Sequence, residues 1–219
     1  MSAIFIFRNM DMVHQILKKA ETEADLTADE LAVLLSINDT EKLQMLYDTA
    51  YRIKERHVGR VAYFRGLIEC SNICIKDCYY CGIRRSNQNV ERFLMDEEEI
   101  YQEAIWAYEA EYGSCVIQAG ERQDEEFIAM IERVVQRISN ETDGRLGITL
   151  SLGEQTEETY QSWKHAGAHR YLLRVETTNP KLYAEIHPAG HDLETRKECL
   201  SALRRTGYQV GTGVMMGLP

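Results

Sequence analysis

Apolar residues recur at helical spacing over the first quarter of the chain. Over residues 10–57 they lie three or four positions apart, which predicts amphipathic helices. The first stripe consists of Met12, Val13, Ile16 and Leu17. Thr27-Ala-Asp-Glu30 reads as a capping box that starts a second helix, and a third is predicted over about 40–57. We therefore predict an N-terminal helical segment at residues 1–58 and a main domain at 59–219.

After residue 60 the pattern changes to short apolar, β-rich runs that alternate with helical stretches. Strands are predicted at 61–68, 115–118, 146–152, 169–175 and 208–215. Helices are predicted at 96–112, 124–138 and 156–166, in a short turn from Pro180, and at 193–206. Five alternations predict an α/β fold with a parallel sheet, either doubly wound or a barrel. In both, ligands bind beyond the carboxyl ends of the strands.

Composition narrows the classes of partner. The formal net charge is -10 and the sequence pI is about 5.2, which argues against binding to nucleic acid. No apolar run approaches the roughly 20 residues that span a bilayer. The apolar run at the start is too short for a signal peptide. We expect a cytoplasmic protein with neither nucleic acid nor membrane as a partner.

Three cysteines stand close together after the first predicted strand. Cys74, Cys78 and Cys81 have three and then two residues between them. Thiolates are soft ligands that suit iron and zinc. Three of them on one loop can converge on one metal centre, whereas four ligands would close a structural site. The set therefore predicts a metal centre with one open position.

The other cysteines leave alternatives for this centre. A zinc site could take its fourth ligand from Cys70, Cys115 or a histidine. A disulfide framework is disfavoured, because six cysteines in 219 residues is a low density and no secretory signal precedes them. We predict that Cys70, Cys115 and Cys199 are ordinary buried thiols.

Glycines and charged residues follow the next three predicted strands. They occur in Ala119-Gly120-Glu121, in Ser151-Leu-Gly-Glu154, and at Arg174 and Glu176. Glycine at a strand end lets a ligand approach the backbone closely. A carboxylate can accept two ribose hydroxyls, and an arginine can hold a carboxylate through its fork. The alternative is a structural Glu–Arg salt bridge at the mouth of the sheet.

The cysteine spacing resembles the signature of the radical S-adenosylmethionine (SAM) superfamily. The resemblance implies a (β/α) barrel of TIM type and a [4Fe–4S] cluster on Cys74, Cys78 and Cys81. It also implies that SAM chelates the open iron and is cleaved to methionine and a 5'-deoxyadenosyl radical. By the same resemblance, Tyr80 lies beside the SAM adenine. The remaining SAM-binding residues implied by the motifs are Gly120, Glu121, Ser151, Glu154, Arg174 and Glu176.

Several motifs narrow the resemblance within the superfamily. Cys-Gly-Ile-Arg-Arg-Ser-Asn, Gln-Ala-Gly-Glu, Leu-Ser-Leu-Gly-Glu, Tyr-Leu-Leu-Arg and Gly-x-Gly-x-Met-x-Gly-Leu-Pro resemble the HydE family of FeFe-hydrogenase maturases. Methylornithine synthases (PylB) are close relatives of that family, and biotin synthases are more distant. The resemblance implies a small-molecule substrate near Met215 and Met216, a ferredoxin or flavodoxin as reductant, and other maturases as partners. A PylB-like lysine mutase and a non-catalytic iron–sulfur or zinc protein remain as alternatives.

The chain departs from the family pattern in two places. Val175 stands where the family often has a histidine, so this chain lacks any role that the histidine side chain plays in the family. The chain also holds five of the eight β/α units of a closed barrel. We therefore expect an incomplete barrel with an open sheet edge after Met215 and with poor solubility or self-association as a result.

Overall fold

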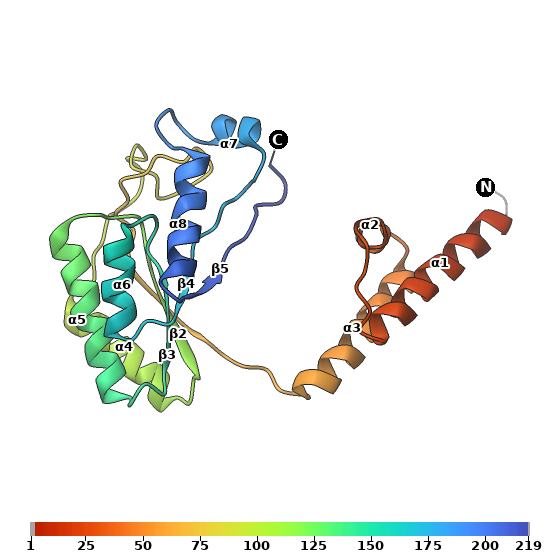
Figure 1. Cartoon of the computed structure of the whole chain (residues 1–219), viewed down its shortest axis with the longest axis horizontal. Coiled ribbons are helices and arrows are strands. Elements are labelled where there is room, and N and C mark those ends of the chain that lie inside the picture. The colour runs from red at the N-terminus through yellow and green to blue at the C-terminus, as the bar shows by residue number, and fades with distance from the viewer. Residues whose placement is uncertain (1–2, 219) are drawn as a thin grey trace. The chain divides into compact units, whose positions relative to one another are not determined.

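The computed structural model describes residues 3–218, with side chains described from residue 12 onwards (Figure 1). Met1, Ser2 and Pro219, which belong to segments used above, lie outside the described residues. Contacts divide the chain into compact units at residues 1–62 and 63–219. The domain assignment to 1–58 and 59–219 stays a prediction.

The first unit is helical. It contains α1 (Ala3–Glu21), α2 (Ala28–Leu35) and α3 (Thr40–Val58). The capping box is confirmed: the Thr27 hydroxyl accepts from the Glu30 N–H, and the Glu30 carboxylate accepts from the Thr27 N–H. The apolar stripe is confirmed for Val13, Ile16 and Leu17, which are buried with Leu34, whereas Met12 is 43% exposed.

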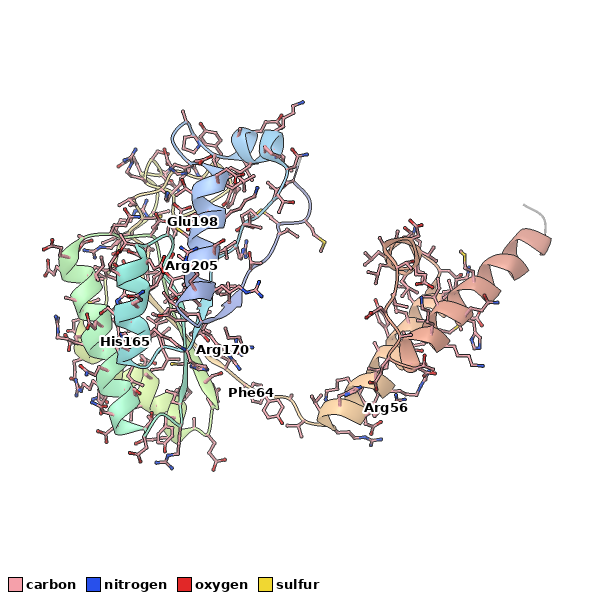
Figure 2. The ribbon with its side chains drawn as sticks, viewed as in Figure 1. Arg56, Phe64, His165, Arg170, Glu198 and Arg205 are labelled. Carbon is pink, nitrogen blue, oxygen red and sulfur yellow. The ribbon has the colours of Figure 1, made fainter. Side chains whose placement is uncertain are left out.

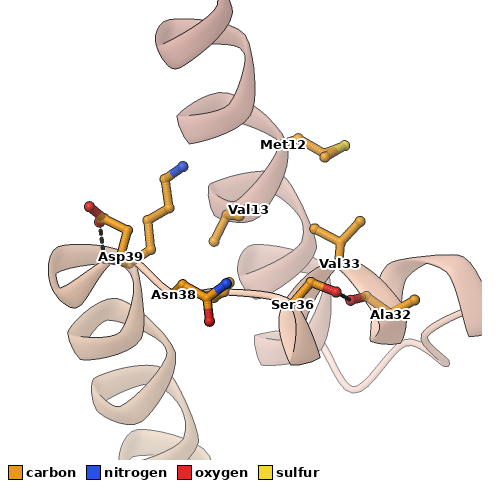
Figure 3. A pocket seen from close by; sticks show the side chains of 9 residues that line it. Met12, Val13, Ala32, Val33, Ser36, Asn38 and Asp39 are labelled. Atoms are coloured by element: carbon orange, nitrogen blue, oxygen red, sulfur yellow. Dashed lines mark hydrogen bonds between the residues drawn. The ribbon is translucent and has the colours of Figure 1, made fainter.

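This unit has its own cavity of about 450 Å³ (Figure 3). Its two ionisable side chains are Asp39 and Lys42. Asp39 caps α3 by accepting the Lys42 N–H at 3.0 Å, and Ser36 donates to the Ala32 carbonyl at 2.7 Å. The side chains of Ser36 and Asp39 thus serve helix ends.

The second unit is a five-stranded parallel sheet in the order β1-β2-β3-β4-β5. The strands are β1 (Gly66–Ser71), β2 (Ser114–Ala119), β3 (Gly147–Ser151), β4 (Arg170–Leu172) and β5 (Gln209–Gly211). The connecting helices are α4 (Glu97–Glu109), α5 (Glu125–Glu141), α6 (Glu157–Ala166), α7 (Pro180–Ile186) and α8 (Leu193–Arg205). Because the order never reverses, right-handed crossovers place successive helices on one face, as in a barrel. The structure thus selects the barrel over the doubly wound fold.

The helix-covered face of the sheet forms the core. Helices α4, α5, α6 and α8 contact one another in sequence (Figure 1). One register row of the sheet packs beneath them. It consists of Ile68, Ile117, Leu150, Tyr171 and Val210. Burial of this row fixes which face of each strand points away from the helices, because side chains alternate along a strand.

The opposite face carries most of the polar side chains of the sheet, together with a few apolar ones. One register row there holds Leu67, Val116, Thr149, Arg170 and Gln209, and the next begins Glu69, Gln118 and Ser151. Gln118 donates to the Glu69 carboxylate at 3.1 Å, and Arg170 donates to the Gln209 side chain at 2.6 Å. In a barrel this face lines the interior.

Three strand predictions were wrong in extent. The fourth strand, predicted at 169–175, spans only Arg170–Leu172. The first strand begins at Gly66, and Tyr63 and Phe64 before it are 83% and 71% exposed. Residues 61–64 favour strand by composition, but they have no neighbouring strand to pair with. The fifth strand ends at Gly211, and beyond it a single bridge joins Val214 to Glu176. Among the described helices, none combines the length and apolar character needed to cross a membrane.

Candidate functional site

The predicted site residues gather around one cavity of about 440 Å³ at the carboxyl ends of the strands. Its lining includes Cys74, Cys78, Tyr80, Cys81, Gly120, Glu121, Ser151, Arg174 and Glu176. Glu154 lies behind this lining and is 5% exposed. The sequence therefore placed the cavity correctly, because carboxyl ends of parallel strands meet at one edge.

Residues 72–95, which carry the three cysteines, are called the cysteine loop. This loop leaves β1 after a register shift between Glu69 and Ser71. The backbone then docks onto the end of β2: Ile75 N–H donates to the Glu121 carbonyl at 2.9 Å, and Gly120 N–H donates to the Ser71 carbonyl at 3.0 Å. A side chain at Gly120 would clash with the Ile73 carbonyl and would lie 2.7 Å from Cys74 Cβ. Glycine is required there because the two backbones nearly touch.

Arg92 holds the far side of the loop together. Its guanidinium donates to the carbonyls of Asn72, Ile83, Arg84 and Asn87 at 2.6, 2.9, 2.8 and 3.2 Å. Asn72 adds a bond to the Glu91 carbonyl and accepts from the Phe93 N–H. These contacts satisfy backbone groups that no helix or strand satisfies.

We expect Arg92→Met to loosen the cysteine loop. Four charge-assisted hydrogen bonds are lost, so amide exchange over residues 72–95 should accelerate by about 10- to 100-fold. Hydrogen–deuterium exchange on the cluster-free protein measures this directly. Arg85→Met is the matched control, because Arg85 is exposed in the same loop. Unchanged exchange in Arg92→Met would show that the loop is held by its other contacts.

Cys74, Cys78 and Cys81 all line the cavity, as the ligands of one iron–sulfur cluster would. Within the described side chains, no group of three or more His, Cys, Asp and Glu is placed to hold a single ion. A four-iron cluster instead takes each thiolate on a different iron. Burial raises the pKa of the Cys74 and Cys78 thiols, a cost that metal ligation offsets by binding the thiolate. The Glu121 N–H lies 3.3 Å from Cys74 Sγ and can stabilise that sulfur when it is charged.

Four charged side chains form a buried cluster beside the cysteine loop. Lys76 donates to Glu154 at 2.6 Å and lies 3.4 Å from a Glu121 oxygen. Arg196 Nε lies 2.7 Å from the other Glu154 oxygen, an ion pair without hydrogen-bond alignment. Burial raises the pKa of Glu121, although the Glu154 N–H and Lys76 oppose it. Two carboxylates and two cations thus balance in a site shielded from water.

Arg174 pairs with Glu176 and not with Glu154. Its Nε and a terminal nitrogen donate to the two Glu176 oxygens at 2.8 and 3.1 Å. Glu176 has φ of 62°, a left-handed conformation that is uncommon outside glycine and marks functional positions. Arg174 and Glu176 therefore form a Glu–Arg pair, the arrangement that the sequence left as an alternative, and their contact with SAM stays a prediction.

Tyr80 is held from the α7–α8 connection. Its hydroxyl lies 3.2 Å from His187 Nε2, and the rings meet edge to face at 5.4 Å. One residue earlier, Tyr79 N–H donates to the Ile186 carbonyl at 3.0 Å. Two successive residues of the cysteine loop are thus bonded to two successive residues at the end of α7.

The sequence analysis did not identify four residues of the site, which are Lys76, Arg92, His187 and Arg196. Arg196 lies on α8, where a charge pattern is typical of a solvated helix face, and nothing local reveals its burial. Lys76 stands inside the cysteine motif, and a lysine between metal ligands was the one available signal.

The remaining predictions had mixed outcomes. Cys70 and Cys115 are fully buried, as expected, but Cys199 is only partly buried and its thiol faces the Gln155 carbonyl at 3.8 Å. Met215 lines the cavity, whereas Met216 is 91% exposed and neither lies in β5. The assignment of Met216 to the cavity was therefore wrong, because the strand ends earlier than its apolar pattern implied.

Known proteins match this arrangement in sequence and fold. The sequence profile of the radical SAM superfamily matches residues 68–219. The [FeFe] hydrogenase maturase subunit HydE of Thermotoga maritima is 40% identical over 206 residues, covering 94% of this chain and 57% of that protein. The methylornithine synthase PylB has a TM-score of 0.82 at 24% identity, covering 93% of this chain and 59% of the other.

HydG, a maturase of the [FeFe]-hydrogenase, has a TM-score of 0.81 at 28% identity over 95% of this chain and 47% of the other. The chain thus spans about half the length of the proteins it matches. The profile covers more than half of the chain and includes the cysteine loop and every strand end that faces the cavity. The chain belongs to the radical SAM superfamily.

Proposed function

We propose that Cys74, Cys78 and Cys81 hold a [4Fe–4S] cluster and that SAM binds in the adjoining cavity of a HydE-like hydrogenase maturase. Members of the superfamily are enzymes that use this cluster and SAM. The observation that carries the proposal is the convergence of the three thiols with the ends of four strands on one cavity. The 40% identity to the maturase supports the narrower assignment.

The side chains around the cavity suit the parts of SAM. When bound, the cluster supplies the electron that cleaves SAM to methionine and a 5'-deoxyadenosyl radical. Glu121 and Arg196 offer opposite charges for the amino and carboxylate groups of the methionine part. Glu176 and Ser151 offer oxygens for the ribose, and Glu154 sets the positions of Lys76 and Arg196.

The partners follow from the same proposal. A ferredoxin or flavodoxin supplies the electron, and a small molecule enters from the polar interior face of the sheet. Other hydrogenase maturases are the expected protein partners, since the maturase relative is named as one subunit. The cytoplasmic location stays a prediction.

A PylB-like lysine mutase is the second candidate, and one observation favours it. The interior face carries both Glu69 and Arg170, opposite charges that suit an amino acid substrate. The buried hydroxyl of Thr149 on the same face has no hydrogen-bond partner among the described residues. The third candidate is a non-catalytic iron–sulfur protein. It would assign no function to the buried cluster formed by Lys76, Glu121, Glu154 and Arg196.

Anaerobic reconstitution followed by an assay for 5'-deoxyadenosine tests the proposal. Cleavage of SAM is expected, and stimulation by thiol-containing small molecules supports the maturase assignment. Stimulation by L-lysine, with formation of 3-methylornithine, would favour the mutase instead. A reconstituted protein that neither binds nor cleaves SAM would leave the non-catalytic reading.

We expect Arg174→Lys to weaken SAM binding. Lysine keeps the charge but loses the planar fork that holds Glu176. Glu176 then no longer presents its oxygens to the ribose, and a lost charge-assisted hydrogen bond to SAM costs about 1.5–3 kcal/mol, so the Kd should rise by roughly 10- to 100-fold. Equilibrium binding of SAM to the reconstituted protein measures the change.

Arg133→Lys is the matched control for this substitution. It removes the same fork from an exposed pair with Glu97 on α4, outside the cavity. If both variants bind SAM as the unaltered protein does, Arg174 only neutralises Glu176.

A further inference from the structure

His187 sits at the end of α7, 107 positions from Tyr80 in sequence. It is 3% exposed, although it carries two polar ring nitrogens. Both nitrogens are used: Nδ1 lies 2.9 Å from the Tyr183 carbonyl, and Nε2 lies 3.2 Å from the Tyr80 hydroxyl. The ring also stacks on Tyr183 at 4.0 Å. Because both ring nitrogens have hydrogen-bond partners and one ring face is stacked, the imidazole is fixed in position.

These contacts fix the direction of each hydrogen bond. A carbonyl oxygen can only accept, so Nδ1 carries a proton and donates it to Tyr183. Burial lowers the pKa of His187, which favours the neutral ring, and then Nε2 has no proton and can only accept. The Tyr80 hydroxyl is the O–H that faces this acceptor at 3.2 Å, so it donates the hydrogen bond to Nε2.

The consequence concerns the orientation of the Tyr80 ring. Tyr80 stands between Cys78 and Cys81 and lines the cavity, whereas His187 does not. A tyrosine ring bonded at its hydroxyl cannot swing about its side-chain torsions as a free ring does. The Tyr80–His187 and Tyr79–Ile186 hydrogen bonds therefore hold the Tyr80 side of the cavity in place, and both partners lie outside the cysteine loop.

We propose that His187 is a positioning residue for SAM, which acts by accepting the Tyr80 hydroxyl and holding the Tyr80 ring against the nucleoside. The inference rests on the proposed function, in which SAM occupies this cavity. The α7–α8 connection then helps to determine SAM affinity although it contributes no metal ligand.

Three substitutions separate the two nitrogens of His187. His187→Gln places an amide where Nε2 stands and can accept from Tyr80. His187→Asn places an amide where Nδ1 stands and can donate to Tyr183. His187→Phe keeps the ring but makes neither bond. We expect the KM for SAM to rise about three- to tenfold in the Asn and Phe variants, with kcat changed less than about twofold, and to recover in the Gln variant.

A double-substitution cycle with Tyr80→Phe tests whether His187 acts through the Tyr80 hydroxyl. Tyr80→Phe alone should raise the KM as much as His187→Phe does. The double variant should show no further increase, because the same bond is lost. Additive effects would mean that His187 acts elsewhere and would overturn the inference.

A measurement on the cluster-free protein is independent of catalysis. Nitrogen-15 spectra of the histidine rings should show His187 protonated at Nδ1 and not at Nε2, and Tyr80→Phe should shift the Nε2 resonance. A proton on Nε2 would contradict the inference whatever the kinetics. The unaltered protein is assayed first: if it fails to cleave SAM, the proposed function falls, whereas normal cleavage with an unchanged KM in His187→Phe overturns only the role of His187.

Discussion

Replacing Cys74, Cys78 or Cys81 by alanine should abolish SAM cleavage. Each thiol is the ligand of one iron in the proposed cluster, so the loss of one leaves that iron without its protein ligand. 5'-Deoxyadenosine formation should fall below detection, and the visible absorbance of the reconstituted cluster should be lost or strongly reduced.

Cys115→Ala is the matched control for the three ligands. Cys115 is fully buried in the core and points to the helix-covered face of β2. Burial raises the pKa of its thiol to about 12, so it remains protonated and does not compete for iron. Equal loss of activity in Cys115→Ala and in a ligand variant would refute the assignment of the three ligands.

Arg196→Leu should strongly destabilise the second unit. Removing this cation leaves Glu154, whose side chain is 7% exposed, with Lys76 as its remaining partner. Breaking one member of a buried ion pair costs about 3–5 kcal/mol, because the other charge stays buried. Urea unfolding followed by circular dichroism measures this loss, and SAM binding should be lost with it.

Arg205→Leu on the same helix is the control. Arg205 contacts Glu157 and Glu198 on an exposed surface (Figure 2). Water already screens these charges, so the urea midpoint should hardly move. If Arg196→Leu is as mild as Arg205→Leu, water screens the charge of Glu154 and the ion pair is not a buried one.

Strand-end residues were predictable because their position depends on local sequence. Glu121 and Arg174 each follow an apolar run, and the parallel sheet brings such positions together. Boundaries were less predictable: residues 61–64 look like a strand, but pairing partners decide which residues become one. The buried partners of Glu154 could not be predicted, since Lys76 lies 78 positions away in sequence and Arg196 lies on a helix with many exposed charges.

The contacts of the cysteine loop also differ in how far they reach along the chain. The side chains of Asn72 and Arg92 form hydrogen bonds inside the cysteine loop. The hydrogen bond between the Glu121 N–H and Cys74 Sγ joins residues that are 47 positions apart in sequence. The bonds of Lys76 and Tyr80 span 78 and 107 residues. Short-range contacts form with the smaller entropy cost, and a chain emerges from the ribosome from its N-terminus. The metal-holding half of the site should thus take shape during synthesis before α8 exists, so iron loading can precede completion of the SAM pocket. Arrested nascent chains ending near residue 150 that fail to protect the loop from protease would contradict this order.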